Sequence, residues 1–245
     1  DYDVRLAGEL TRYYIPGLGI VDVKTSLSVV PGVNRVGTHV TGRAQAWVRR
    51  FDNGFLAGLA GGLPYLETNL VRDRDGIVHF RNLRITAPSL VLTGNGFRRR
   101  DGTFHFEGGG RQATYGPLRL TLDGRIERPK LAIFLPRPLD ALGIADMRLF
   151  LDPNAAGFVY RANGGSSLGL WTSAGAILLP KGEAARIAVG LLDVAAMRAT
   201  GELVSHGRGF DGRLRVTGPG IDGMLAFDRP GDLQRIALSF DATNA

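Results

Sequence analysis

The residue types that most often carry out chemistry are sparse in this sequence and form no recognisable catalytic set. The four histidines, His39, His79, His105 and His206, share no spacing typical of a metal site. There is no cysteine, so neither a thiolate nucleophile nor a disulfide can form. No G-x-S-x-G nucleophile motif occurs either. We therefore interpret the histidines as strand-face residues and expect no catalytic residue, no metal, no cofactor and no enzyme activity.

The densest basic motif is the run Arg98-Arg99-Arg100, followed by Asp101 and Gly102. Because it separates two strand-like segments, we expect it at the tip of a hairpin. Three arginines there could contact the phosphate of a lipid headgroup or of a nucleic acid, or could form a solvated turn. Binding of single-stranded nucleic acid would favour stacking aromatics beside the basic patch, and these are few, so no nucleic-acid partner is expected.

Two other polar motifs have simpler readings. Asp73, Asp75 and Gly76 share only part of a calcium-loop pattern, and a polar turn explains them better. Gly17-Leu18-Gly19 precedes Ile20 and Val21, which read as a strand. A phosphate-binding glycine loop leads into a helix instead, so this motif predicts no nucleotide site.

The elements that carry these residues alternate between apolar and polar positions. Leu118, Leu120 and Leu122 occupy one parity of their segment, and polar residues occupy the other. Side chains of a strand point alternately to opposite faces, so such segments predict a sheet with one apolar face. This apolar face must be covered, either by another protein layer or by something apolar that the protein carries. We expect the following residues to lie on it: Val78, Phe80, Leu90, Leu92, Phe104, Phe106, Leu118, Leu120, Leu122, Leu214, Val216, Leu225, Phe227, Ile236, Leu238 and Phe240.

Composition supports many strands and few helices. The chain has 245 residues, of which 44% are hydrophobic and 35 are glycine, which suits strands joined by tight turns. The formal net charge is +7, compatible with anionic partners or with a solvated surface. The sequence contains no run of about 18 uncharged apolar residues, so it predicts no membrane-spanning helix. Since the chain starts at Asp1 directly in a strand-like pattern, we expect a segment of a longer protein.

Several local features mark the boundaries of the expected elements. Residues 51–62 have helical spacing, and residues 136–143 could form a single helical turn. Residues 184–198 fit either a strand or a helix, and we favour strands. A change of parity near Asn82 predicts a bulge, Gly94-Asn95-Gly96 a hairpin turn, and Gly108–Gly110 a turn or bulged edge. We expect one continuous domain over residues 1–245, with a weak break near 51–75.

Several glycine-punctuated segments carry a family resemblance. They include Tyr115–Leu120, Gly124–Leu131, Pro136–Asp140, Ala199–Leu203, Gly209–Leu214 and Gly220–Leu225. From about Gly76 onward the chain resembles the TamB branch of AsmA-like proteins. The resemblance implies an all-β fold: a long, curled, mostly single-sheet β-taco with an open U-shaped groove and one or two short helical interruptions.

The resemblance also implies a function. It implies a bridge-like lipid transfer protein in the periplasm of a Gram-negative bacterium, anchored to the inner membrane by a segment outside this chain. Its partners would be phospholipids, carried between the inner and outer membranes, and a TamA-like outer-membrane barrel protein in outer-membrane protein assembly. The apolar residues named above would then line a lipid-binding groove, with Arg98, Arg99 and Arg100 as weaker headgroup contacts.

Other classes remain open from the residues. A scaffold could offer its sheet edge to unfolded outer-membrane strands without carrying lipid. A β-helix hydrolase would need clustered carboxylates on one face, whereas the acidic residues here fall mostly in turns. An outer-membrane barrel would need aromatic girdles, and aromatic residues make up only 8% of the chain.

Overall fold

The structure, a computed structural model, describes residues 4–16, 18–31, 38–52, 54–138, 143–180, 183–206, 209–229 and 233–242. The chain divides into two compact units, Asp1–Ile133 and Phe134–Ala245. Strands dominate both units, and they pair antiparallel through short connections. The expected fold class is therefore confirmed: the chain is all-β, and within each unit the strands form a curled, unclosed sheet of the β-taco kind, interrupted by a short helix in the first unit.

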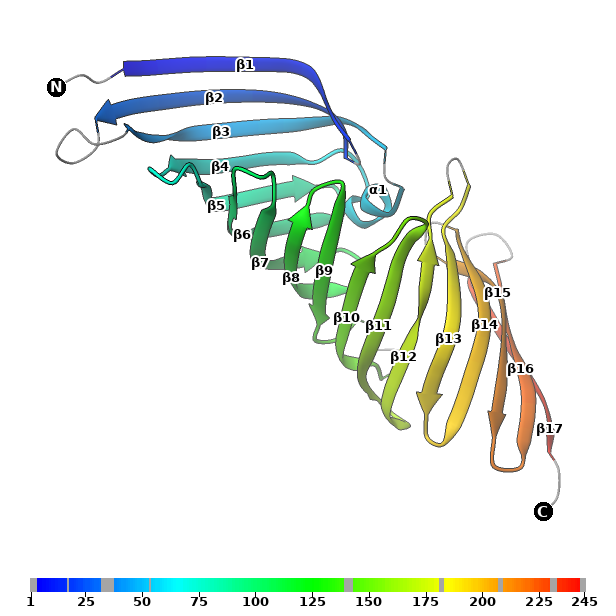
Figure 1. Cartoon of the computed structure of the whole chain (residues 1–245). Coiled ribbons are helices and arrows are strands. Elements are labelled where there is room, and N and C mark those ends of the chain that lie inside the picture. Colours follow the sequence, from blue (N-terminus) through cyan, green and yellow to red (C-terminus); the bar gives the residue numbers. More distant parts are fainter. Residues whose placement is uncertain are drawn as a thin grey trace. The chain divides into compact units, whose positions relative to one another are not determined.

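In the first unit, each strand pairs with the next one along the chain. Figure 1 shows that the strand direction rotates progressively from β1 to β9, as the twist of a β-sheet requires. The elements are β1 Val4–Ile15, β2 Gly19–Pro31, β3 Thr38–Phe51, α1 Gly54–Ala60, β4 Tyr65–Arg72, β5 Val78–Ala87, β6 Leu90–Arg98, β7 Phe104–Gln112, β8 Gly116–Arg125 and β9 Arg128–Leu135.

Helix α1 confirms the helical spacing seen in residues 51–62. The carbonyl oxygen of Ala60, its last residue, accepts a hydrogen bond of 2.8 Å from the amide of Ser89, in the turn after β5. The carbonyl oxygen of Pro64 accepts one of 3.0 Å from Val48 in β3. These bonds hold the connection between β3 and β4 against the ends of the strands.

The second unit is a meander of eight hairpin-connected strands among the described residues (Figure 1). The strand interpretation of residues 184–198 is confirmed, because β13 and β14 occupy most of that range. Of the expected helical turn at 136–143, residues 139–142 lie outside the described residues. The strands are β10 Ala145–Pro153, β11 Gly157–Ser166, β12 Gly169–Leu178, β13 Arg186–Val194, β14 Met197–His206, β15 Gly209–Gly218, β16 Ile221–Asp228 and β17 Arg235–Ala242.

The bulge expected near Asn82 is present. The register between β5 and β6 shifts between Phe80 and Leu83, and Asn82 has a φ of 53°. The Asn82 amide donates a 3.0 Å hydrogen bond to the side chain of Asn95. Asparagine tolerates this left-handed conformation better than most residues, and a side-chain acceptor replaces the lost ladder bond.

Two glycine motifs were wrongly assigned to turns. Gly94–Gly96 lies inside β6, and Gly108–Gly110 lies inside β7 without a bulge. Gly94 and Gly108 are cross-strand partners. A Cβ added to Gly108 would lie 2.6 Å from the Phe106 ring and 3.1 Å from the Gly94 Cα, so glycine serves close packing here instead of chain reversal.

Candidate functional site

The strand register of the first unit gathers the expected groove residues on one face. Directly paired residues point to the same side of a sheet, and residues two apart along a strand share that side. Phe106 pairs with Leu122, and Leu92 pairs with Gly110, which in turn pairs with Leu118. The apolar face of the first unit includes Val78, Phe80, Leu90, Leu92, Phe104, Phe106, Leu118, Leu120 and Leu122.

The second unit has a corresponding face. Leu214 pairs with Leu225, which pairs with Leu238. Phe227 pairs with Ile236 in the neighbouring row. The apolar face of the second unit therefore includes Leu214, Val216, Leu225, Phe227, Ile236, Leu238 and Phe240.

Burial along these faces is uneven. Leu92 is 2% exposed, Phe106 3% and Leu214 3%, whereas Leu238 and Phe240 in β17 are each 57% exposed. Within each unit, the contacts between described elements run mainly between strands adjacent in the chain, and no second sheet or helical layer covers either apolar face in the residues described. The curled sheet thus buries its middle by packing side chains on one another. Its outer strands leave apolar surface for a partner.

Aromatic rings on these faces lie opposite glycines. Gly96 in β6 is the cross-strand partner of both Phe80 in β5 and Phe106 in β7. In the second unit, Tyr160 pairs with Gly175, and a Cβ added there would lie 2.9 Å from the Tyr160 ring. Glycine leaves room for the ring to lie on the neighbouring backbone, as in the rescue of strand glycines by aromatic residues. Our sequence analysis missed this role, although glycines at alternate strand positions signal it.

The opposite face of the first unit carries the histidines in carboxylate pairs. His105 Nδ1 lies 2.6 Å from Asp123 Oδ1, and His79 Nε2 lies 3.4 Å from Asp73 Oδ2. His39 Nδ1 lies 3.8 Å from the other oxygen of Asp73. These three histidines are strand-face residues, as the sequence indicated. The side chain of His206, in β14, is outside the described part.

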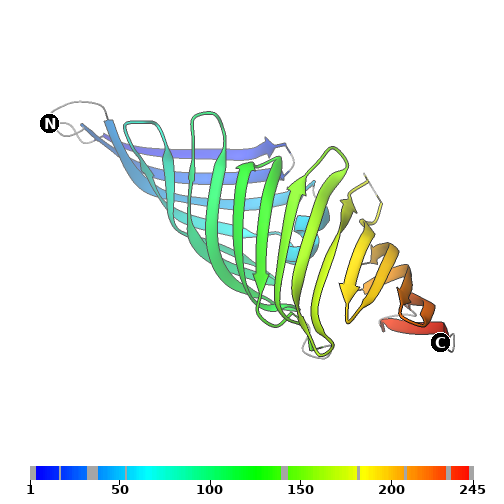
Figure 2. The ribbon, with the colours of Figure 1, turned by 60° about the horizontal axis from the view of Figure 1, so that its bottom comes forward.

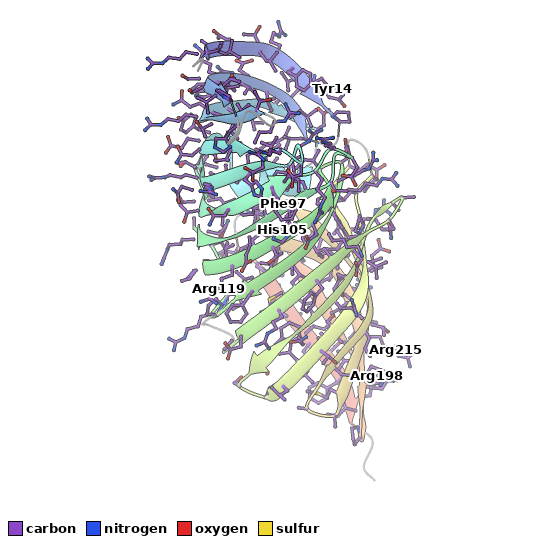
Figure 3. The ribbon with its side chains drawn as sticks, turned by 60° about the vertical axis from the view of Figure 1, so that its left-hand side comes forward. Tyr14, Phe97, His105, Arg119, Arg198 and Arg215 are labelled. Carbon is purple, nitrogen blue, oxygen red and sulfur yellow. The ribbon has the colours of Figure 1, made fainter. Side chains whose placement is uncertain are left out.

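Phe97 lies between two of these histidines in the register. Its ring stacks on that of His105 with 5.1 Å between the centroids (Figure 3), and it lies 6.1 Å from that of His79. In the residues that the structure places, no three histidine or carboxylate side chains gather in a way that could hold a metal ion. Asp123, His105, Phe97 and His79 form a row of cross-strand partners over four strands. Because this row depends on the register, the sequence alone does not reveal it.

The Arg98–Arg100 motif lies in a hairpin turn, as expected, but its side chains diverge. Arg98 is the cross-strand partner of Val78, so it lies on the apolar side of the sheet in the first unit. The Arg99 guanidinium lies 4.7 Å from the centroid of the Phe97 ring on the other face. Arg100 Nη2 donates a 3.4 Å hydrogen bond to the carbonyl oxygen of Arg74. Only Arg98 of the three is directed toward the apolar face.

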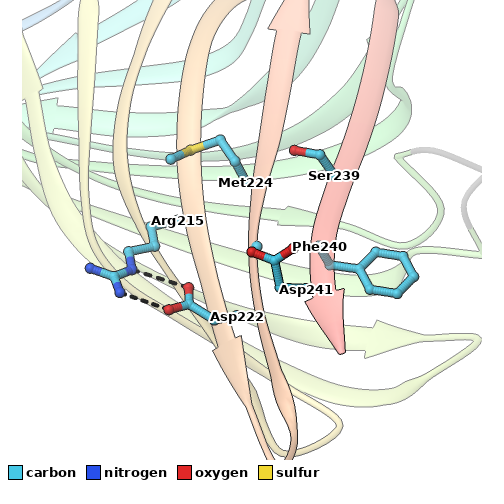
Figure 4. Close-up of a pocket in the computed structure, with 7 residues that line it drawn as sticks. Arg215, Asp222, Met224, Ser239, Phe240 and Asp241 are labelled. Carbon is cyan, nitrogen blue, oxygen red and sulfur yellow. Dashed lines mark hydrogen bonds and ion pairs between the residues drawn. The ribbon is translucent and has the colours of Figure 1, made fainter. Parts of the chain in front are cut away.

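A shallow pocket in the second unit lies mainly on the polar side of β15–β17 (Figure 4). Arg215 binds Asp222 through two hydrogen bonds, of 3.2 Å from Nε and 2.8 Å from Nη2. These bonds lower the pKa of Asp222 and raise that of Arg215. The rest of the lining comes from Gly223, Met224, Ser239, Phe240 and Asp241. This mixed, solvent-open surface lacks the nucleophile–base pair of a catalytic site.

Comparisons with known proteins assign no family to this chain: no protein-family model, no curated protein and no solved structure matches it. Among the described helices, none has the length and apolar character needed to cross a bilayer. The candidate site therefore depends on the chain's own geometry, and its most extensive features are the two apolar faces.

Proposed function

We propose that this chain shields phospholipid acyl chains on its apolar faces and acts in lipid transport without catalysing a reaction. The observation that supports the proposal is the register, in which the residues named from the sequence share one face of the sheet within each unit. Each methylene group removed from water contributes about 0.8 kcal/mol. An apolar face without a protein layer over it can supply that burial to a fatty tail.

The family resemblance extends this proposal to a cellular setting. The chain would form part of a periplasmic bridge of a Gram-negative cell envelope, anchored in the inner membrane by another segment. It would carry phospholipids between the inner and outer membranes, with a TamA-like barrel as its partner in outer-membrane biogenesis. Transport along an apolar face needs no chemical step, which is consistent with the sparse set of reactive side chains.

The test compares two substitutions on neighbouring residues of β8. Leu120→Asp places a charge on the apolar face of the first unit, and Thr121→Asp places the same charge on the opposite face. Lipids extracted from purified chains are measured by mass spectrometry, and circular dichroism checks that the sheet is intact. We expect bound phospholipid in the wild type and in Thr121→Asp, with a loss in Leu120→Asp. A folded Leu120→Asp chain that retains wild-type lipid would contradict the proposal.

A second candidate function is a scaffold that pairs its outer strand with unfolded outer-membrane strands. Its support is β1, a 12-residue strand at the margin of its unit (Figure 1) that is exposed along almost its whole length. Such a strand can template the pairing of another chain. Crosslinks from Leu6 to nascent barrel proteins, together with lipid-free purified chain, would favour this function over lipid shielding.

A further inference from the structure

Apart from the connection between β3 and β4, which carries Asp52, the turns at the two ends of the described strands in the first unit differ in charge. We call the turns after β4, β6 and β8, together with the strand residue on either side of each turn, the basic rim. The turns after β1, β5 and β7, likewise with their flanking strand residues, are the neutral rim. The neutral rim contains no charged residue, and it includes Pro16, Pro88, Ser89, Thr114 and Tyr115. The basic rim combines acidic residues with more numerous arginines: Arg72, Arg74, Arg98, Arg99, Arg100, Arg125 and Arg128.

Most of the acidic side chains of the basic rim already have hydrogen-bond or ion-pair partners. Asp101 accepts hydrogen bonds from the amide and the hydroxyl of Thr103, at 2.9 and 2.8 Å, and these bonds lower its pKa. Asp75 accepts a 2.9 Å bond from the amide of Ile77. Asp73 lies beside His79, on the face of the sheet opposite the apolar face of the first unit. These carboxylates cap turns or pair with histidine, which leaves Arg72 and Arg98 available to another anion.

Two arginines of the basic rim are directed toward the apolar face of the first unit. Arg72 of β4 and Arg98 of β6 are both cross-strand partners of Val78 in β5. They therefore flank Val78, with their strands roughly 10 Å apart. Both are exposed, and neither forms an ion pair within the described structure.

Apolar side chains continue inward from this pair. Phe104 is the next partner of Arg98 across the sheet, and its ring packs on Phe80 with 5.3 Å between centroids. Beyond them lie buried Leu92 and Phe106. The same face therefore changes from cationic at its margin to fully apolar in its middle, over a few residues of each strand.

From this arrangement, we propose that Arg72 and Arg98 bind the anionic headgroup of an amphiphile whose tail lies across the apolar face of the first unit toward the neutral rim. The inference rests on the proposed function, and it adds the charge of the ligand and its direction across the sheet. A guanidinium pairs well with phosphate or carboxylate oxygens. An acyl tail that entered from the neutral rim would leave that headgroup without a cationic partner.

The test uses the 245-residue chain and three probes: dodecyl phosphate below its micellar concentration, an uncharged amphiphile with the same dodecyl tail, and inorganic phosphate. We expect dodecyl phosphate to bind more tightly than the uncharged amphiphile, and increasingly less tightly as salt is raised. The double variant Arg72→Gln, Arg98→Gln should weaken dodecyl phosphate binding about fivefold or more and leave the uncharged amphiphile unaffected.

The matched control is Arg111→Gln with Arg119→Gln, which removes the same charge from the opposite face of the first unit (Figure 3 labels Arg119). This control should retain wild-type binding of all three probes. Equal weakening in the control would show a general charge effect and overturn the inference.

The remaining outcomes separate this inference from the proposed function. Equal binding of charged and uncharged amphiphiles in every variant overturns the headgroup site but preserves the lipid-binding face. If inorganic phosphate binds at Arg72 and Arg98 as tightly as dodecyl phosphate does, these arginines form a site for a free anion. That result would overturn the inference that their ligand is an amphiphile. Failure of both amphiphiles to bind contradicts the proposed function and the inference together.

The direction of the tail has its own measurement. A dodecyl phosphate analogue with a photoreactive group at the end of its tail should label peptides that contain the turns after β5 and β7. An analogue with the reactive group beside the phosphate should label peptides that contain Arg72 or Arg98. Labelling in the reversed pattern would overturn the proposed orientation.

Discussion

Phe80 and Phe104 pack ring to ring on the apolar face of the first unit although they belong to β5 and β7, with β6 between them. Their centroids are 5.3 Å apart, and the ring planes are inclined by 38°. The strand between them contributes Gly96, the cross-strand partner of Phe80, which has no side chain to separate the rings. Such an aromatic pair contributes about 0.5–1.5 kcal/mol beyond the burial of its area.

Adjacent glycines of β7 should respond oppositely to the addition of one methyl group. A Cβ at Gly108 would lie 2.6 Å from the Phe106 ring, whereas at Gly109 its nearest neighbour would be 3.4 Å away. We expect Gly108→Ala to lower the free energy of unfolding by about 1–3 kcal/mol. Gly109→Ala should leave it unchanged or raise it by about 0.5 kcal/mol, because alanine restricts the unfolded chain. Urea titrations measure both, and equal effects would refute the steric explanation.

Leucines of the two apolar faces should differ in their contribution to stability. Leu92 is 2% exposed, so Leu92→Ala leaves a cavity and should cost about 2–5 kcal/mol. Leu238 is 57% exposed, so Leu238→Ala should cost less than about 1 kcal/mol. The unfolding midpoints in urea test this difference. A cost at Leu238 as large as that at Leu92 would mean that another layer covers β17 in solution.

The turn between β13 and β14 uses residues poorly suited to its backbone. Ala195 and Ala196 have φ values of 49° and 61°, as in a type I′ turn, for which Asn-Gly is preferred. Ala195→Asn combined with Ala196→Gly should raise the free energy of unfolding by about 1–2 kcal/mol. The control, Ala155→Gly in a turn with no positive φ at that alanine, should not stabilise the chain. Thermal denaturation compares them.

Acid should weaken the ion pair between Arg215 and Asp222. The pKa of Asp222 is lower in the folded chain than its ordinary value of 3.8, chiefly because it accepts the Arg215 hydrogen bonds. The folded state therefore binds this proton less readily than the unfolded state, and its contribution to stability is present above pH 3.8 and lost as the pH falls below it.

Two asparagine substitutions test this dependence. Asp222→Asn should flatten the acid limb of stability measured by urea unfolding between about pH 5 and about pH 2. The control is Asp241→Asn, which removes the carboxylate of the cross-strand partner of Asp222. Its acid limb should stay steeper than that of Asp222→Asn. An identical acid limb in the wild type and in Asp222→Asn would contradict this assignment.

The alternation of apolar and polar residues was enough to predict an all-β chain and the parity of the strands that carry the apolar faces, whereas the curled β-taco form was what the family resemblance implied. Side chains of a strand alternate between faces whatever the tertiary structure, so Leu118, Leu120 and Leu122 had to share a side. The Asn82 bulge also followed from parity. The sequence did not distinguish a glycine that reverses the chain from one that admits an aromatic ring. For that reason, Gly94–Gly96 and Gly108–Gly110 were wrongly assigned to turns.

Only the tertiary structure decided which strands meet and which residues become neighbours. Pairing across the sheet brings His105 to Asp123 and directs Arg98, alone of its triplet, to the apolar face. It also places Arg72 and Arg98 on either side of Val78. These relationships depend on the register between strands. Turn lengths and bulges set that register for each pair of strands. A row such as Arg72, Val78 and Arg98 combines the registers of successive pairs, which alternation within one strand does not give.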